Sequence, residues 1–475
     1  MDFKEIAQMA RDEAKRYGVQ FMDIRIREGD WSSISLQDGK ADKIGTGKGV
    51  GMGIRVLLNG VWGFASSDEV TREKAMDCLR AAVEMAKASL SRIKERIEIA
   101  EAEPIEDVYE SRYEIDPRSI PLERKKEILS SFEKAALSKM GDKAANTILW
   151  YSDSVTREIV CNTFGTLTDS KYVRVRIGAR MTAKDGDIRR SGYEGIGRVS
   201  GFEVIEGLSA EELSVAAAET ALNLLSAKRP PAGKFPVIFH PDISGIFIHE
   251  ALGHNAEADL VLKGESILEG KLGTKIASDL VTVIDDATME GEWGFYKYDS
   301  EGVPGQRRTI IDKGILVGFM HSLETAAKFG VRPNGSARAQ DHGSRPIVRM
   351  SNTFVAPGSS KFEDMVKDID LGILLRKGQW GYVMCEKGQY TCHAGEAFLI
   401  KDGEIRDRLC DVSISGMILE TLENVDAVSE EFRMEKGGGT CGKDGQGMAV
   451  SGGGPYIRVK EVVVGGQELI GGERR

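Results

Sequence analysis

The sequence predicts an α+β fold, in which an N-terminal region of repeated helix–strands–helix units precedes a β-rich C-terminal domain. Helical and strand-like hydrophobic periodicities recur in the same order twice before residue 228. Two prolines and a glycine within Lys228–Lys234 then interrupt the periodic pattern, and short strand-like runs follow. The chain has 475 residues, enough for two or three domains. We therefore predict an N-terminal region over residues 1–227 and a C-terminal domain over residues 228–475.

The first predicted unit covers residues 1–98. Its opening helix has apolar residues on one face and ends before Gly18, a residue that favours helix termination. Alternating segments then predict strands, and a second helix closes the unit. The predicted elements are a helix over 2–17, strands over 19–27, 32–37 and 45–66, and a helix over 70–90. An acidic segment with two prolines, 100–120, is predicted to be a linker.

The second predicted unit covers residues 121–227 and has the same order of elements. Its last helix carries a capping signal, because Ser209 is followed three residues later by Glu212. The predicted elements are a helix over 121–138, three strands within 146–183, and a helix over 210–227. The two units share this pattern but little sequence identity, so the repeat is one of architecture.

Glycine alternates with other residues from Gly45 to Gly53, which leaves one face of the predicted strand without side chains. Our preferred interpretation is that this strand packs tightly against a helix or a neighbouring sheet. The alternative is that the backbone of a peptide or partner approaches it here.

The C-terminal domain is predicted to be rich in short strands and to carry the candidate site. It begins with a strand over 235–240 and a helix over 242–254. Further strands are predicted over 281–285, 309–311, 315–321, 347–354, 381–386, 396–405 and 456–464. Helices are predicted over 323–329, 362–369 and 414–425.

Composition narrows the function classes. The formal charge is −10 and no strong basic block occurs, so we expect no nucleic-acid partner. No apolar run approaches the roughly 20 residues of a membrane span, and the N-terminus predicts an amphipathic helix rather than a signal peptide. The six cysteines lack pair spacing, which favours free thiols or a metal ligand in a cytoplasmic protein.

The segment His249-Glu250-Ala251-Leu252-Gly253-His254 carries the chemistry of a hydrolytic metal site. Two imidazoles bind Zn²⁺, and an adjacent carboxylate such as Glu250 takes a proton from water. In the common H-E-x-x-H motif the histidines are four residues apart, whereas here they are five apart. On an ideal helix that spacing separates the rings by roughly 140°. Both rings can face one metal only if the turn is widened, as in a π-bulge, or broken at Gly253.

Cys441 is a candidate third ligand, because a thiolate binds Zn²⁺ well and the surrounding glycines allow a loop to fold tightly around a bound centre. Glu257, three residues after His254, is better placed to orient an imidazole than to bind the metal. The residues alone leave several rivals for the third ligand, namely His240, His393, Cys392, Glu257 and Asp259.

Two further segments invite a functional interpretation. Gly437–Lys443 resembles a phosphate-binding loop, but Asp444 replaces the hydroxyl residue that would hold Mg²⁺, so we expect no nucleotide. The polar segment Arg338–Arg345 could bind substrate carbonyls or a terminal carboxylate, and a solvated loop is equally consistent with it. His321, His342 and His393 are isolated in the sequence and are expected to be structural or exposed.

These stretches together resemble the TldD branch of the TldD/PmbA metallopeptidase family. The resemblance rests on HEALGHNAEADL, on GGGTCGKDGQ at 437–446, and on the shorter segments 299–304 and 349–354, in the same order over nearly the whole chain. It implies a zinc ion held by His249, His254 and Cys441, with Glu250 as the general base. It also implies a dimer, with a motif-lacking PmbA/TldE-like paralogue as the partner, and cleavage of short or unfolded peptides in a cavity between subunits.

The sequence therefore predicts a cytoplasmic zinc peptidase in which Glu250 takes a proton from water and passes it to the leaving amine. The alternative is a non-enzymatic partner subunit of a TldD/PmbA-type complex, in which any zinc is structural. The intact HExxxH motif favours the enzyme.

Overall fold

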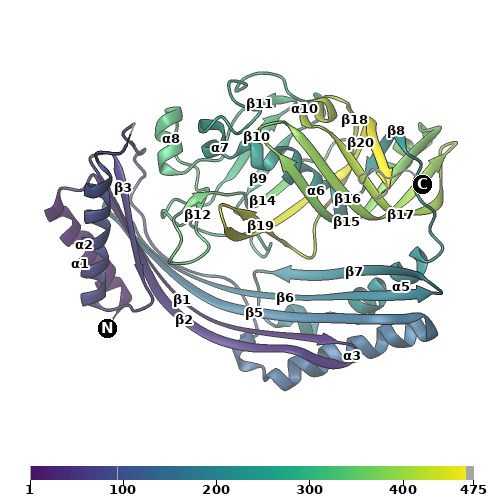
Figure 1. The fold of residues 1–475 in the computed structure, drawn as a ribbon, viewed down its shortest axis with the longest axis horizontal. Coiled ribbons are helices and arrows are strands. Elements are labelled where there is room, and N and C mark those ends of the chain that lie inside the picture. Colours follow the sequence, from purple (N-terminus) through teal and green to yellow (C-terminus); the bar gives the residue numbers. More distant parts are fainter. Residues whose placement is uncertain (1, 94, 467–475) are drawn as a thin grey trace.

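The computed structural model describes residues 2–93 and 95–466 and shows an α+β protein, so the predicted fold class is confirmed (Figure 1). Within these ranges, most strands belong to one of two large sheets, one of seven strands and one of eleven. The chain passes from the first sheet to the second between β7 (Ile188–Arg198) and β8 (Gly233–Phe239). The division of the chain into domains at residue 228 stays a prediction.

The first sheet has the strand order β3-β2-β1-β5-β6-β4, with β7 paired to β6. Its other strands are β1 (Phe21–Gln37), β2 (Lys40–Leu58), β3 (Val61–Ser67), β4 (Glu106–Glu110), β5 (Ala144–Asn162) and β6 (Leu167–Asp185). Strands β1 and β5 pair antiparallel from Asp23↔Asn162 to Gln37↔Ile148. The two predicted helix–strands–helix units therefore join into one continuous sheet.

The two faces of this sheet differ in polarity. Helices cover one face of the sheet (Figure 1), namely α1 (Phe3–Ala14), α2 (Arg72–Ser89), α3 (Leu122–Met140) and α5 (Ala216–Leu224). The side chains beneath them, such as Ile24 on β1 and Ile177 on β6, are buried and apolar. The opposite face carries Arg25, Arg55 and Arg176 and turns toward the C-terminal sheet. This alternation follows from the two-residue period of a strand.

Local capping signals act as the sequence predicts. The Asp2 side chain accepts a hydrogen bond from the Lys4 backbone at the start of α1, and Gly18 adopts a φ of 67° after the helix. The Ser209 hydroxyl accepts from the Glu212 backbone N–H, while the Glu212 carboxylate accepts from the Ser209 N–H. This reciprocal pair is the predicted capping box, and it precedes a π-helical turn over Glu211–Val215.

Four expectations for the N-terminal region are wrong. The strand expected over 45–66 spans the hairpin turn between β2 and β3. The predicted linker contains β4, which pairs parallel to β6. Residues 146–183 form two long strands rather than three, and the third strand, β7, follows them. The predicted break after residue 27 is absent, because Gly29 pairs with both Gly49 on β2 and Thr156 on β5. Pairing on both sides holds this polar stretch extended against its local propensity.

The glycine face of β2 is covered by individual side chains, rather than by the helix or neighbouring sheet that we expected. The indole of Trp31 lies so close that a Cβ on Gly47 would approach its Nε1 to 2.5 Å. A Cβ on Gly51 would meet the His342 ring at 2.3 Å. Side chains from the chain itself thus cover much of the bare face.

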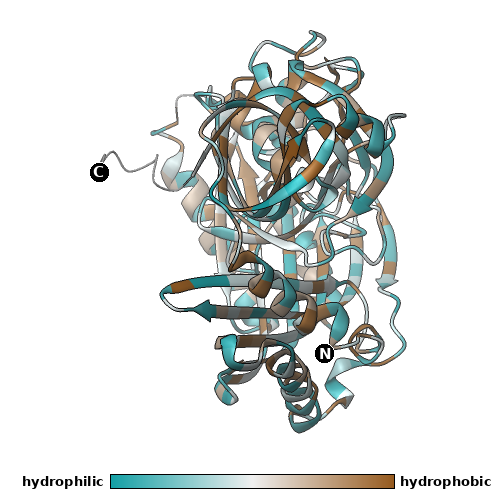
Figure 2. Cartoon of the chain, turned by 90° about the vertical axis from the view of Figure 1, so that its right-hand side faces the viewer, coloured by the Kyte–Doolittle hydropathy of each residue, from teal (hydrophilic) through white to brown (hydrophobic). Residues whose placement is uncertain are grey.

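The C-terminal sheet surrounds a helix, α6 (Pro241–Ile248), most of whose residues are buried. Figure 2 shows hydrophobic segments inside this part of the molecule. Its long strands are β15 (Leu371–Met384), β16 (Gln389–Lys401), β17 (Glu404–Met417), β18 (Val425–Met434) and β20 (Gln446–Gly466). Its short strands are β9 (Val283–Asp286), β10 (Arg307–Asp312), β11 (Ile315–Leu316), β14 (Asn352–Val355) and β19 (Gly439–Lys443). Strands β12 (Ala337–Arg338) and β13 (Ile347–Val348) pair with each other. The short helices are α7 (Ala258–Leu262), α8 (Leu323–Phe329), α9 (Phe362–Lys367) and α10 (Ile418–Glu423).

Several predicted boundaries in this domain are also wrong. The strand expected over 396–405 spans a hairpin turn, where Asp402 and Gly403 have φ values of 52° and 74°. Such positive angles reverse the chain between antiparallel strands. The helix expected from residue 414 begins only at Ile418, because β17 continues to Met417. The strands expected over 315–321 and 347–354 are both shorter than predicted, and residues 349–351 separate β13 from β14.

The two sheets are joined through the segment Arg338–Arg345. The Arg25 guanidinium on β1 donates hydrogen bonds to the carbonyls of Asp341 and Ser344. Arg55 on β2 forms an ion pair with Glu301 at 2.8 Å.

No helix among the described residues is both long and apolar enough to span a bilayer.

Candidate metal centre

Helix α6 delivers both histidines to one side through a widened turn. The helix begins at Pro241, where the His240 ring accepts a hydrogen bond from the Asp242 N–H. Beyond Ile248 it becomes a π-helical turn over His249–Gly253, closed by the His254 N–H donating to the His249 carbonyl. Gly253 keeps a helical φ of −52°. The five-residue spacing is therefore accommodated by widening rather than by a break.

The third candidate ligand approaches from a distant hairpin. Cys441 lies on β19, which pairs with β20, and its Sγ is 3.4 Å from His254 Nε2. One donor atom from each of His249, His254 and Cys441 lies within 4.8 Å of the others. The imidazole rings are nearly perpendicular, with centroids 5.0 Å apart. Two imidazole nitrogens and one thiolate match the donors that zinc prefers, so these residues fit the metal.

Buried hydrogen bonds hold the cysteine hairpin in place. The guanidinium of Arg349, which is fully buried, donates to the carbonyls of Cys441 and Gln446. The Trp293 indole N–H donates to the Gly439 carbonyl at 3.1 Å. Because these bonds fix the backbone on either side of Sγ, the thiol is presented to the histidines by a preorganised loop.

The electrostatics of the cluster favour a thiolate. Burial alone would raise the pKa of Cys441, but hydrogen bonds and charge from His249 and His254 lower this pKa to about 5. In contrast, burial raises the pKa of Cys385 to about 12 and of Cys161 to about 11. Burial works against the charged form of His254, yet Glu257 and Cys441 raise its pKa well above the ordinary value. Cys441 is thus the cysteine whose environment suits metal binding.

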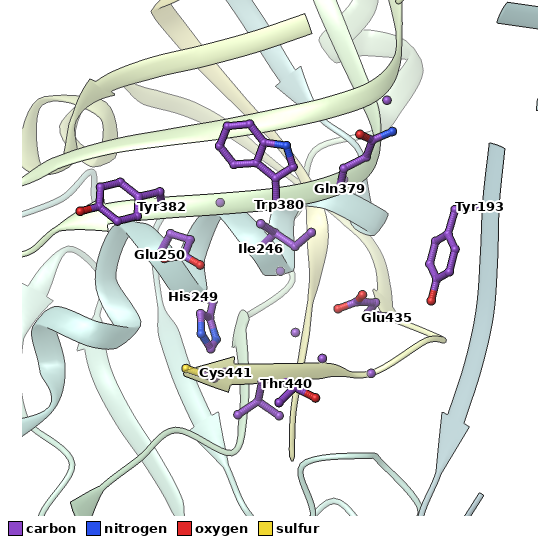
Figure 3. Close-up of a pocket in the computed structure, with 18 of the residues that line it drawn as sticks. Tyr193, Ile246, His249, Glu250, Gln379, Trp380, Tyr382, Glu435, Thr440 and Cys441 are labelled. Atoms are coloured by element: carbon purple, nitrogen blue, oxygen red, sulfur yellow. The ribbon is translucent and has the colours of Figure 1, made fainter. Parts of the chain in front are cut away.

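Glu250 lies beside the three donors in a cavity of about 1100 Å³. Figure 3 shows His249 and Glu250 on the helix and Cys441 on the strand below them, with Trp380 and Tyr382 on the strand above. The carboxylate packs against β15, where a Cβ on Gly381 would come within 2.5 Å of Glu250 Cγ. A glycine is needed at this position because the two elements approach so closely.

Glu257 links the histidine to a buried charge network. Its carboxylate accepts a hydrogen bond from His254 Nδ1 at 3.1 Å and has no exposed surface. Lys443, also buried, pairs with Glu257 at 3.2 Å and with Asp259 at 2.7 Å. The attraction of Lys443 and His254 overcomes burial and lowers the pKa of Glu257. An ionised carboxylate at Nδ1 leaves Nε2 free for a metal.

The rival ligands lie elsewhere. His240 caps α6, Asp259 pairs with Lys443, and Cys392 is buried in β16 outside the donor cluster. His393 stacks on Trp380 at 5.5 Å and bonds Ser413. His321 bonds Thr325, and burial lowers its pKa to about 4.

The Arg338–Arg345 segment has structural contacts instead of a substrate pocket. Arg338 is buried and donates to the carbonyls of Met350 and Ala449. His342 contacts Asp68 at 2.8 Å.

Sequence reasoning missed three residues around the site. Lys443 is part of the segment that resembles a phosphate loop, but its partners are carboxylates. Arg349 belongs to a recognised segment without an assigned role. Glu435, which lines the cavity in Figure 3, stands out only once the chain is folded. A charged residue in an otherwise buried run is the sequence signal that points to Arg349, whereas Lys443 lies in an exposed glycine-rich stretch that gives no such signal.

Comparison with known proteins gives a consistent result. Models of the PmbA/TldA metallopeptidase family match the chain over residues 22–86 (domain 1), 115–225 (central domain) and 232–466 (C-terminal domain). A metalloprotease of Methanothermobacter thermautotrophicus is 41% identical, covering 94% of this chain and 96% of its own length. A zinc metalloprotease TldD homolog of Saccharolobus solfataricus is 27% identical, covering 95% and 98%. The crystal structure of TldE from Thermococcus kodakarensis has a TM-score of 0.77 at 20% identity, covering 97% of this chain and all of that chain.

These matches place this α+β protein in the metallopeptidase class. The chain belongs to the PmbA/TldA metallopeptidase family, which confirms the resemblance found in the sequence.

Proposed function

We propose that this protein is a zinc-dependent peptidase that hydrolyses short or unfolded peptides, with His249, His254 and Cys441 as the zinc ligands and Glu250 as the general base. The observation that carries the proposal is the cluster itself. Three donor atoms from segments 187 residues apart in sequence meet within 4.8 Å, in a cavity that also holds a carboxylate. The name of the zinc metalloprotease relative supports the choice of metal.

Each residue has a defined task. When bound, zinc supplies the Lewis acidity that makes water nucleophilic near neutral pH. Glu250 accepts the proton from the attacking water and returns it to the leaving amine. Glu257 holds the His254 ring with Nδ1 protonated, so that Nε2 points to the cluster.

Strand β15 offers a place for an extended substrate. It pairs with β8 over Ile373–Leu375, and beyond Leu375 β16 is its only partner among the described strands. The cavity is lined by Gly378–Val383 of this strand, next to Glu250. A peptide that adds to this free edge gains main-chain hydrogen bonds whatever its sequence, which suits a broad peptidase.

The experiment is a cleavage assay on a flexible peptide combined with metal analysis. We expect about one zinc per chain, with nitrogen and sulfur ligands in its X-ray absorption spectrum. Glu250→Gln should retain the zinc and lose turnover, whereas Glu265→Gln, an exposed change outside the cavity, should retain both. A chelator should abolish cleavage by the wild type. Persistent turnover in Glu250→Gln, or a metal without sulfur ligation, would overturn the assignment of residues.

We further propose that the working form is a dimer with a motif-lacking paralogue of the PmbA/TldE type. The likeness to the TldE structure supports this proposal, because it gives a related chain the same fold. Native mass spectrometry of the protein alone and with such a paralogue measures the stoichiometry and the metal together. If the protein alone is a monomer and adding the paralogue does not increase its rate of peptide cleavage, the proposal is contradicted. Zinc bound without cleavage in either form would instead favour the non-enzymatic subunit.

A further inference from the structure

The wall of the cavity opposite the metal donors is formed by the polar face of the N-terminal sheet. Arg176 and Arg180 lie on β6, Arg189 lies on β7, and all three line the same cavity as His249 and Glu250. Their placement follows from the register, in which Arg180 pairs with Tyr193 and Lys184 pairs with Arg189. Paired residues of antiparallel strands share a face, so these arginines project to the same side.

Aromatic rings occupy the surface of the sheet between the arginines. Trp150 and Tyr193 stack with centroids 5.6 Å apart and an interplanar angle of 9°. Trp150 covers Gly178, where a Cβ would lie 2.3 Å from the indole, and Tyr193 covers Gly195, where a Cβ would lie 2.5 Å from the Tyr193 hydroxyl oxygen. Figure 3 shows Tyr193 on this wall, across from the strand that carries Cys441. The wall is therefore a flat aromatic surface with guanidinium groups at its margins.

Two of the four lining arginines have side chains without a hydrogen bond or an ion pair within the described residues. Arg176 donates to the Gly438 carbonyl, and Arg190 lies 3.6 Å from Asp411. Arg180 and Arg189 are exposed, and neither side chain has a hydrogen bond or ion pair to any residue in the described ranges. Of the carboxylates that line the cavity, Asp411 is near Arg190, Glu250 lies beside the zinc ligands, and Glu435 is on the β18–β19 connection.

We propose that Arg180 and Arg189 form a subsite that binds carboxylate groups of the peptide substrate, so that acidic peptides are preferred over neutral and basic ones. The proposal rests on the proposed peptidase function and adds a substrate class to it. A guanidinium offers paired N–H donors that match the geometry of a carboxylate.

The position of each arginine along its strand determines how far it lies from the hairpin that carries Cys441. The Gly197 N–H donates to the Lys436 carbonyl, so the Arg176 end of the wall lies beside the hairpin that carries Cys441. Arg180 is four residues farther along β6, roughly 13 Å at the rise of a strand. Arg189 pairs with Lys184, which lies four residues beyond Arg180 on β6, roughly another 13 Å along the strand. Arg180 should therefore contact carboxylates nearer the scissile bond than Arg189 does.

The test uses short peptides that differ only in glutamate, glutamine or lysine at the same positions, each with an amidated C-terminus. A glutamine peptide with a free C-terminus is added to separate side-chain carboxylates from a terminal one. The readouts are kcat/KM for the wild type and the dissociation constant of a fluorescent peptide for the zinc-loaded Glu250→Gln form. The variants are Arg180→Gln, Arg189→Gln and the double charge reversal to glutamate. Arg332→Gln, which removes an exposed charge outside the cavity lining, is the matched control.

We expect the wild type to prefer the glutamate over the glutamine peptide by about tenfold, and each single variant to lose much of this ratio. The double reversal should prefer the lysine peptide, and Arg332→Gln should behave as wild type. High salt should weaken the preference. A scan of single glutamates should place the Arg189 effect farther from the cleaved bond. If the free C-terminus alone reproduces the preference, the carboxylate bound is the terminal one.

The outcomes separate the two proposals. Cleavage without charge preference, or a preference that the double reversal leaves intact, would overturn the subsite while the peptidase stands. Selective binding by the Glu250→Gln form without cleavage by the wild type would overturn the peptidase and retain the subsite. Circular dichroism melting of each variant checks that the sheet is folded.

Discussion

At the scale of single residues, the carboxylate behind His254 decides how well the metal is held. Glu257 is fully buried and bonds Nδ1, so it fixes both the ring orientation and the nitrogen that faces the cluster. We predict that Glu257→Gln weakens zinc affinity by about 10- to 100-fold. Competition with a chromophoric chelator measures it. Glu265→Gln, an exposed change of the same kind, should leave affinity unaltered, and equal affinities for the two variants would contradict the role of Glu257.

A second prediction at this scale concerns pH. Zinc requires neutral imidazoles and a thiolate. Burial lowers the pKa of His254, but the charge of Glu257 outweighs it and raises this pKa well above the ordinary value. The pKa of Cys441 is lowered to about 5. The thiol is therefore already ionised near neutrality, and protons compete for the histidines. We expect zinc affinity to weaken steadily as pH falls and to level off once the imidazoles are neutral. Titrations across this range check the trend, and affinity independent of pH would contradict it.

The candidate ligands and Glu257, the partner of His254, were accessible to sequence reasoning, while the long-range contacts that hold them in place were not. Two histidines around a glutamate, and a cysteine among glycines, carry chemistry in their types and spacing alone. The contact between Glu257 and Lys443 exists only because a hairpin folds against the π-turn. Nothing in the spacing of these two residues, 186 positions apart in sequence, indicates that contact.

At the scale of elements, the site depends on the close approach of α6 and β15. We predict that Gly381→Ala displaces Glu250, because the added methyl would lie 2.5 Å from its Cγ. Turnover should fall by about tenfold or more while zinc content is retained, since a small misplacement of a reacting group has a large effect on rate. Peptide cleavage and metal analysis of the same sample test this.

The control for that change is Gly49→Ala on β2, where an added Cβ meets no atom within 4 Å. It makes the same substitution in a strand but leaves the site untouched, so its turnover should match the wild type. Normal turnover in Gly381→Ala would show that Glu250 tolerates the displacement.

Element by element, local signals predicted helices better than strands. Gly18 and Ser209 carry capping chemistry that can be recognised from the local sequence, and the helices at these points are present. Strand limits depend on partners that are distant in sequence. The polar stretch at Gly29 continues strand β1 because β2 and β5 both pair with it. The turn at Asp402 interrupts a segment whose sequence resembles a single strand. Such boundaries are set by tertiary pairing.

At the scale of the whole molecule, the cavity lies between two sheets that the sequence treats as separate regions. Glu250 and the two histidines lie on the helical segment that the C-terminal sheet surrounds, and Cys441 lies on β19 of that sheet. The facing wall with Trp150 and Arg180 belongs to the N-terminal sheet. Sequence reasoning predicted each region but not which face of the first would meet the second. That choice follows from polarity, because helices cover the apolar face and leave the charged one for the cavity.

A site between two sheets should select substrates by their state of folding. The cavity measures about 1100 Å³, which is room for a segment of extended chain and far less than a packed domain occupies. We predict that the protein digests a small substrate protein once it is denatured and spares the same protein in its native form. The measurement follows both forms by mass spectrometry, with Glu250→Gln and a chelator as controls for contaminating proteases. Equal cleavage of native and denatured forms would contradict selection of unfolded substrates by the size of the cavity. Cleavage that appears only after a motif-lacking paralogue is added would mean that the partner completes the cavity, and the preference for the denatured form should then be measured on that complex.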